Sequence, residues 1–225
     1  MNCFVVGISA PSGGGKTALV QHLAQAVTQA VALSFDEYDE VTEGANLHPE
    51  NLQQWLRDGA DYNAWQMPGL IRDLAKLKQG QPIRSPIAGA WLTPQPLIFL
   101  DAPFGYANAQ LRPYLDYVVY VDTPLDIAMA RRIERDYSQQ AQPNAEVARQ
   151  QIQKMVSTYL VWARQAYLAQ DRQVKPHCNL VLDGMLAINV LVEQILVSVE
   201  ARIKGRRTSA NELAPKTPSS SSDEG

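Results

Sequence analysis

Residues 3–17 read CFVVGISAPSGGGKT, and this stretch decides the fold. Its first six residues form an apolar run of the β-branched and aromatic types that favour strands. Three consecutive glycines follow, and behind them ALVQHLAQAV carries apolar residues at helical spacing, which predicts a helix over 17–30. The order of strand, glycine loop and helix places the positive end of a helix dipole at the loop. Such a loop is suited to binding an anion.

Residues 10–17, APSGGGKT, match the phosphate-loop pattern, with Ala10 in place of the usual first glycine. The glycines allow successive backbone N–H groups to turn towards phosphate oxygens. Lys16 would place its charge on the β- and γ-phosphates, and the Thr17 hydroxyl would ligate Mg²⁺. The pattern therefore predicts ATP and Mg²⁺ as cofactors. The predicted nucleotide-binding residues of this loop are Ser12, Gly13, Gly14, Gly15, Lys16, Thr17 and Ala18.

Four apolar runs each end on an aspartate. They are 31–35 before Asp36, 97–100 before Asp101, 117–121 before Asp122 and 180–182 before Asp183. Helical patterns occupy 50–57, 67–79, 124–136, 144–170 and 186–203, whereas the proline-rich residues 80–96 predict a loop or short edge strands. Strands that alternate with helices predict an α/β protein with a parallel sheet of about five strands, and with the phosphate loop they predict a three-layer α/β/α phosphate-loop NTPase fold. The carboxyl edge of such a sheet carries the chemistry.

The chain has 225 residues, of which 19% are charged, and a formal net charge of −3. This balance does not indicate a nucleic-acid binder and fits a protein with a small-molecule substrate. No stretch approaches the roughly 18 apolar residues of a membrane span, and no secretory leader is visible, so we expect a cytoplasmic protein without membrane partners. We expect one domain over 1–203, with a lid around 131–143 and a disordered tail over 204–225. The sequence is compatible with a homodimer but does not establish an oligomeric state.

The segment LSFDEYD, at 33–39, resembles the corresponding segment of the uridine kinase, phosphoribulokinase and nicotinamide riboside kinase superfamily. In that family the aspartate of this segment accepts the proton of the hydroxyl that attacks the γ-phosphate. The resemblance implies that Asp36 is a catalytic base. The alternative from the residues alone is a strand-terminal aspartate that caps a loop.

Two later segments are similar to the same family. LIFLDAPFG, at 97–105, looks like a strand that normally ends in Glu-Gly, and here Asp101 and Ala102 replace those two residues. A carboxylate at this place would hold Mg²⁺ directly or through water. VDTPLDIAMARRIERD, at 121–136, resembles the strand and lid helix whose arginines close over the transferred phosphate. The resemblance implies that Arg131 and Arg135 are catalytic and that Arg132 binds the nucleotide, the alternative being a solvated basic helix face.

The acceptor region is less well defined. DYNAWQMPGLIRDLAKLKQGQPI, at 61–83, is similar to the family's acceptor segment, and Asp61 and Asn63 stand where that family has an acidic motif. Aromatic residues of these regions would either form the acceptor pocket or pack in the core. They are Tyr38, Tyr62, Trp65 and Trp91. The predicted substrate residues are Asp36, Tyr38, Asp61 and Trp65.

Together these patterns predict an ATP-dependent phosphotransferase that acts on a hydroxyl of a nucleoside-, vitamin- or sugar-like metabolite. Residues 36–66 are acidic, which favours an uncharged acceptor over a phosphorylated one, although Arg57 or Arg84 could reach the site. A nucleotide kinase is one alternative. A nucleotide sensor without a small-molecule acceptor is another, and the departures at Ala10, Asp101 and Ala102 keep it open.

Overall fold

A parallel five-stranded sheet forms the centre of the molecule. The computed structural model describes residues 3–39, 51–86, 88–138 and 145–212. The strand order is β2-β5-β1-β6-β7. The strands are β1 (Phe4–Ser9), β2 (Ala30–Ser34), β5 (Leu97–Asp101), β6 (Tyr117–Asp122) and β7 (Leu180–Asp183). Because β1 is central and the later strands add on both sides of it, the strand order reverses there and opens a crevice at its carboxyl end.

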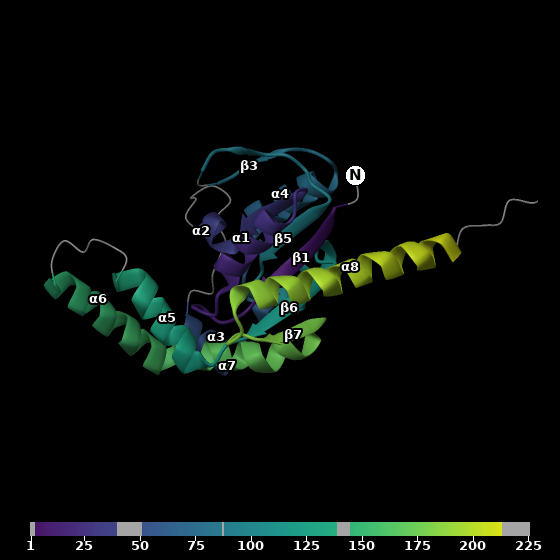
Figure 1. The fold of residues 1–225 in the computed structure, drawn as a ribbon. Helices are drawn as coiled ribbons and strands as arrows, with labels where there is room; N and C mark the ends of the chain where they lie inside the picture. The colour runs from purple at the N-terminus through teal and green to yellow at the C-terminus, as the bar shows by residue number, and fades with distance from the viewer. Residues whose placement is uncertain (1–2, 40–50, 87, 139–144, 213–225) are drawn as a thin grey trace, which may run out of the picture.

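Helices cover both faces of this sheet (Figure 1). On one face, Leu23 and Ile195 pack against a core that includes Val119 of β6. These two residues belong to α1 (Lys16–Ala26) and α8 (Ile188–Glu212). The opposite face is covered by α2 (Phe35–Asp39), α3 (Leu52–Arg57), α4 (Pro68–Lys78) and α7 (Arg164–Gln173). The predicted three-layer α/β/α architecture is therefore confirmed.

Two helices extend away from the sheet (Figure 1). They are α5 (Leu125–Ser138) and α6 (Ala145–Thr158), and α6 has no buried residue. A π-helical turn, Tyr159–Ala163, joins α6 to α7, so the helix predicted over 144–170 continues to Gln173 with one widened turn. Such turns are frequent at functional sites because they re-aim the side chains around them.

The remaining short elements connect these layers. The proline-rich stretch forms a separate antiparallel pair, β3 (Ile83–Arg84) and β4 (Trp91–Leu92), outside the main sheet. Single turns of 3₁₀-helix follow α3 and β5 and precede β6 and β7. They are Tyr62–Ala64, Gly105–Ala107, Arg112–Tyr114 and Lys175–His177. None of the helices within the described ranges combines the length and apolar character that a membrane span needs.

The structure moves one predicted boundary near the site. β2 ends at Ser34, and Asp36 lies in the first turn of α2 and not at a strand terminus. The cause is local packing, because the Phe35 ring is buried and meets the Phe104 ring edge-on at 5.4 Å. This contact turns the chain into α2 directly after the strand.

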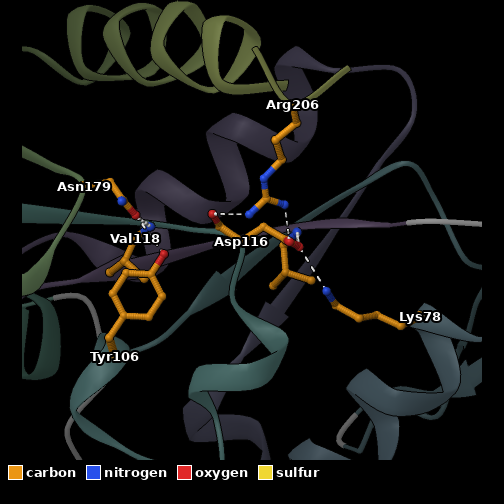
Figure 2. Close-up of polar contacts among 7 residues, drawn as sticks. Lys78, Tyr106, Asp116, Val118, Asn179 and Arg206 are labelled. Carbon is orange, nitrogen blue, oxygen red and sulfur yellow. Dashed lines mark hydrogen bonds and ion pairs between the residues drawn. The ribbon is translucent and has the colours of Figure 1, made fainter. Parts of the chain in front are cut away.

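The predicted start of the tail is wrong. α8 continues to Glu212, so residues 204–212 are helical, and residues 213–225 lie outside the described ranges. Arg206 donates to Asp116 at 2.6 Å (Figure 2). Its guanidinium lies 5.1 Å from the Phe4 ring centroid. Asp116 also accepts from the Val5 amide at 2.9 Å and from Lys78 at 3.0 Å. Burial raises the Asp116 pKa, but these hydrogen bonds outweigh it and lower the pKa.

Candidate active site

The loop between β1 and α1 has a backbone that suits an anion. Gly13 and Gly15 have φ angles of 82° and 96°, which L-residues rarely adopt. The Gly14 amide donates to the Pro11 carbonyl at 2.9 Å, and the Gly14 carbonyl accepts from Thr123 Oγ1 at 3.1 Å. The N-cap residue of α1 is Gly15, which offers no side chain to cap the helix start, and the first turn carries no acidic residue. The N–H groups at this helix start are therefore available to a phosphate.

Three side chains meet beside this loop. Thr17 Oγ1 donates to Asp101 Oδ2 at 2.9 Å, and Lys16 Nζ lies 4.0 Å from Asp101 Oδ1. Asp101 is 1% exposed, and burial raises its pKa, an effect that Lys16 opposes and Asp36 reinforces. Asp101 Oδ1 is buried and accepts no hydrogen bond from the described part of the chain. A buried carboxylate oxygen without a donor fits a cation, so the residues present suit Mg²⁺.

A cavity of about 630 Å³ lies over these residues. It gathers residues that the sequence predicted separately, from four segments of the chain. They are Ser12, Gly13, Gly15, Lys16, Thr17, Ala18, Asp36, Asp101, Arg131 and Arg135. In the described ranges no group of three or more His, Cys, Asp or Glu side chains gathers to hold a metal ion. A Mg²⁺ ion here would therefore share its coordination with phosphate oxygens and water.

The three lid arginines do not face the same way. Arg131 and Arg135 line this cavity, with Arg131 held by the Gly184 carbonyl at 3.2 Å. Arg132 instead lies 3.4 Å from the Tyr167 hydroxyl and 3.6 Å from Asp136. It lines a separate cavity of about 430 Å³ between α5 and α6. The structure therefore does not bring Arg132 to the phosphate side of the site, where we predicted it.

A second cavity of about 250 Å³ adjoins the first. The two share Ser12, Lys16 and Asp36. Aromatic residues make up half of its lining, namely Phe35, Trp55, Tyr62, Trp65, Phe104, Trp162 and Tyr167. The rings of Trp55, Tyr62, Trp65 and Phe104 contact one another at centroid distances of 5.0–5.8 Å. A molecule in this cavity can therefore lie beside both Asp36 and the phosphate-loop residues Ser12 and Lys16.

Sequence reasoning found only part of this aromatic cavity. Tyr62 and Trp65 line it, but Tyr38 is buried, with its hydroxyl 3.2 Å from Asp73 Oδ2. Asp61 caps a 3₁₀ turn by accepting from the Asn63 amide at 2.9 Å, and it does not line the cavity. Trp91 is 66% exposed on the β3–β4 pair. Tyr38 and Asp61, which were predicted as substrate residues, therefore do not line this cavity, and Trp91, for which pocket and core were both open, lies in neither. Sequence reasoning missed Trp55, Trp162 and Gln170, which adjoin no recognisable motif, and Phe104, which lies within the LIFLDAPFG segment but was not singled out.

The acidic character predicted around the acceptor is also only partly present. Asp36 and Glu37 border the larger cavity, and Glu37 accepts from the Ser85 hydroxyl at 3.3 Å. Asp58 accepts from Gln54 on the exposed side of α3. Glu40, Glu43 and Glu50 lie outside the described residues. In the aromatic cavity, burial is the largest influence on the Tyr62 hydroxyl and raises its pKa.

A phosphate loop, an adjacent carboxylate and helix-borne arginines around one cavity define a P-loop kinase. The model of the phosphoribulokinase/uridine kinase family matches residues 5–166, and the chain belongs to that family. It is therefore an ATP-dependent small-molecule kinase, a phosphotransferase that acts on a hydroxyl acceptor.

Individual relatives are distant in sequence. Uridine kinase of Borrelia duttonii is 24% identical over 188 residues, which cover 79% of this chain and 85% of the relative. Uridine kinase of Cronobacter sakazakii is 26% identical over 152 residues, which cover 61% of this chain and 70% of that relative. The structure of shikimate kinase from Acinetobacter baumannii, in complex with shikimate, superposes with a TM-score of 0.45. It is 16% identical over 88% of this chain and 94% of that one.

Proposed function

We propose that this chain transfers the γ-phosphate of Mg·ATP to a hydroxyl of an uncharged nucleoside-, vitamin- or sugar-like metabolite that occupies the aromatic cavity. The observation that carries the proposal is the junction of the two cavities at Ser12, Lys16 and Asp36. A phosphate on the loop and a hydroxyl in the aromatic cavity would meet there. Holding the two reactants in that geometry supplies much of the rate enhancement in phosphoryl transfer.

The residues around this junction have separate tasks. The loop N–H groups and Lys16 bind the phosphates, and the Thr17 hydroxyl and Asp101 would hold Mg²⁺. That ion, when bound, neutralises charge that develops on the β- and γ-phosphates. Asp36 accepts the proton of the acceptor hydroxyl as its oxygen forms a bond to the γ-phosphorus. The bond from that phosphorus to the β,γ-bridging oxygen breaks, ADP leaves, and Arg131 and Arg135 stabilise the transferred charge.

The wall of the aromatic cavity favours an uncharged acceptor. Among its lining residues Lys16 is the one cation in the described part of the chain, and the phosphate loop already uses it. Arg57 lines a different cavity, and Arg84 lies 5.7 Å from the Trp91 ring centroid, so neither reaches the acceptor. The phosphate group of a phosphorylated acceptor would therefore lack a cationic partner in this cavity. This observation speaks against the nucleotide-kinase alternative.

The test is ADP release from Mg·ATP across a panel of nucleosides, vitamins, free sugars and their phosphates. Lys16→Ala serves as the blank. We expect release that depends on an unphosphorylated metabolite, is absent in the blank, and is largely lost in Asp36→Asn while ATP still binds. A preference for phosphorylated acceptors would refute the acceptor class. An unchanged rate in Asp36→Asn would refute the assignment of Asp36 as the base.

A further inference from the structure

Gln170 lies at a position that the proposed chemistry does not use. It comes from α7, is 6% exposed, and points its amide nitrogen at three oxygen atoms. These are Ser9 Oγ at 3.3 Å, the Ala10 carbonyl at 3.2 Å, and the Pro103 carbonyl. Since buried amides are costly to leave unpaired, this cluster fixes the side chain in one orientation. A flipped amide would place its oxygen against two carbonyl oxygens.

The three oxygens belong to the two segments that build the phosphate site. Ser9 ends β1, Ala10 is the first residue of the phosphate-loop pattern, and Pro103 follows Asp101 by two residues. Ser9 Oγ itself donates to the Pro103 carbonyl at 2.7 Å, so the two segments are already joined at this point. Gln170 adds a third element, α7, to the same junction. A displacement of α7 would therefore act on both segments at once.

The same helix forms one wall of the aromatic cavity. Trp162, in the π-helical turn, and Ala166, Tyr167 and Gln170, in α7, all line it. Their spacing of four, five and eight residues from Trp162 places them on one helix face. A molecule in the cavity would press on this face, and the Gln170 amide would carry the displacement to the phosphate loop. Gln170 itself both lines the cavity and reaches the Ala10 carbonyl at the loop, so one side chain links the two sites.

We propose that Gln170 is a positioning residue that couples occupancy of the aromatic cavity to the phosphate loop. The inference rests on the proposed function, because it takes the aromatic cavity as the acceptor site. The coupling runs in both directions, since linkage between two binding sites is reciprocal. Nucleotide on the loop therefore changes the environment of the cavity wall through Gln170, and this effect can be measured without knowing the acceptor.

Tryptophan emission reports on the cavity directly. Trp55, Trp65 and Trp162 line it, and Trp91 is the fourth tryptophan of the chain. In a Trp91→Phe background all tryptophan emission thus comes from the cavity wall. The Trp91→Phe protein is the parent, and AMP-PNP with Mg²⁺ is titrated into it and into the same protein carrying Gln170→Met. The affinity of each protein for AMP-PNP is measured separately by calorimetry.

We expect the parent to show an emission change that saturates with the nucleotide affinity. Gln170→Met should lose most of this change while its affinity for AMP-PNP stays within about threefold, because coupling and binding are separate quantities. Gln173→Met is the matched control. Its amide donates to the Gly59 carbonyl at 2.7 Å, away from the loop, so it should keep the full change. If Gln170→Met does not fold, Gln170→Glu keeps the side-chain length but turns an oxygen towards the carbonyls, and the same loss is expected.

Three results would overturn the inference. One is an emission change of equal size in parent and Gln170→Met. Another is no change in a parent that binds AMP-PNP. The third is a loss in Gln170→Met that merely follows a collapse of nucleotide affinity, since Gln170 would then only support the loop. If the parent binds AMP-PNP no better than Lys16→Ala does, the proposed function fails with the inference. If the parent binds AMP-PNP normally and Gln170→Met shows the same emission change, the inference is refuted but the proposed function is not.

Discussion

The close approach of α5 to the phosphate loop leads to a quantitative prediction at Gly13. A Cβ added there would lie 2.1 Å from the Ala128 carbonyl oxygen, which is backbone and cannot move alone. At Gly15 an added Cβ meets nothing within 4 Å. Both residues have positive φ, so an alanine at either position carries a similar backbone strain of about 1–2 kcal/mol. Gly13→Ala must also push α5 outwards, an overpacking cost of roughly 1–3 kcal/mol more.

Thermal unfolding of the two variants without nucleotide measures this difference. In a chain of this size each kcal/mol lowers Tm by about 2–4 °C, so Gly13→Ala should melt roughly 2–12 °C below Gly15→Ala. Because α5 also carries Arg131 and Arg135, we expect Gly13→Ala to lose more turnover at saturating ATP than Gly15→Ala. Equal melting temperatures would refute the close packing of α5 on the loop. The positions of both arginines would then need a different explanation.

Further predictions concern buried polar groups and the end of α8. Asp101→Asn should raise the Tm of the nucleotide-free protein at pH 7. Burial raises the Asp101 pKa, so the contribution of this carboxyl to the free energy of unfolding is fully present at low pH, where it is protonated, and is lost as the pH rises through the raised pKa. A lower Tm would contradict the sign of this shift. Tyr62→Phe should be neutral or stabilising by up to about 1–3 kcal/mol in denaturant unfolding, since its buried hydroxyl has no partner in the described ranges. Arg206→Ala should cost about 1 kcal/mol in low salt, less in high salt, whereas the exposed Lys204→Ala should cost nothing measurable.

The phosphate side of the site could be predicted because its contacts are close in sequence or follow from strand ends. Thr17 and Asp101 are far apart in the chain, yet parallel strands bring the end of β5 beside the end of β1, with Ile8 opposite Asp101. The parallel sheet therefore brings the loop and the carboxylate together. For the lid arginines, the position on a helix could be predicted but not the direction in which each one points. Their helical spacing was visible, but which face of α5 turns towards the loop depends on packing at Gly13.

The aromatic cavity could not be predicted in the same way. Trp55, Phe104 and Trp162 come from α3, the loop after β5 and the π-helical turn, and only tertiary packing brings their rings together. An aromatic residue in a core and one in a cavity look alike in a sequence. Tyr38 was therefore predicted as a substrate residue although it is buried in the core. The end of α8 was missed for another reason. The polar residues after 203 suggest a tail, but Arg206 donates a hydrogen bond to Asp116 in the folded protein.

The departures from the family pattern are compatible with a working phosphate loop because glycines stand opposite the added methyl groups. A Cβ at Gly14 would lie 2.8 Å from the Ala10 Cβ, and a Cβ at Gly7 would lie 3.1 Å from the Ala102 Cβ. Each alanine is buried, at 1% and 0% exposure, and fills space that its glycine partner leaves empty. The loop keeps its internal hydrogen bond, and Asp101 still reaches Thr17. These substitutions are therefore no argument for a nucleotide sensor that has lost its turnover.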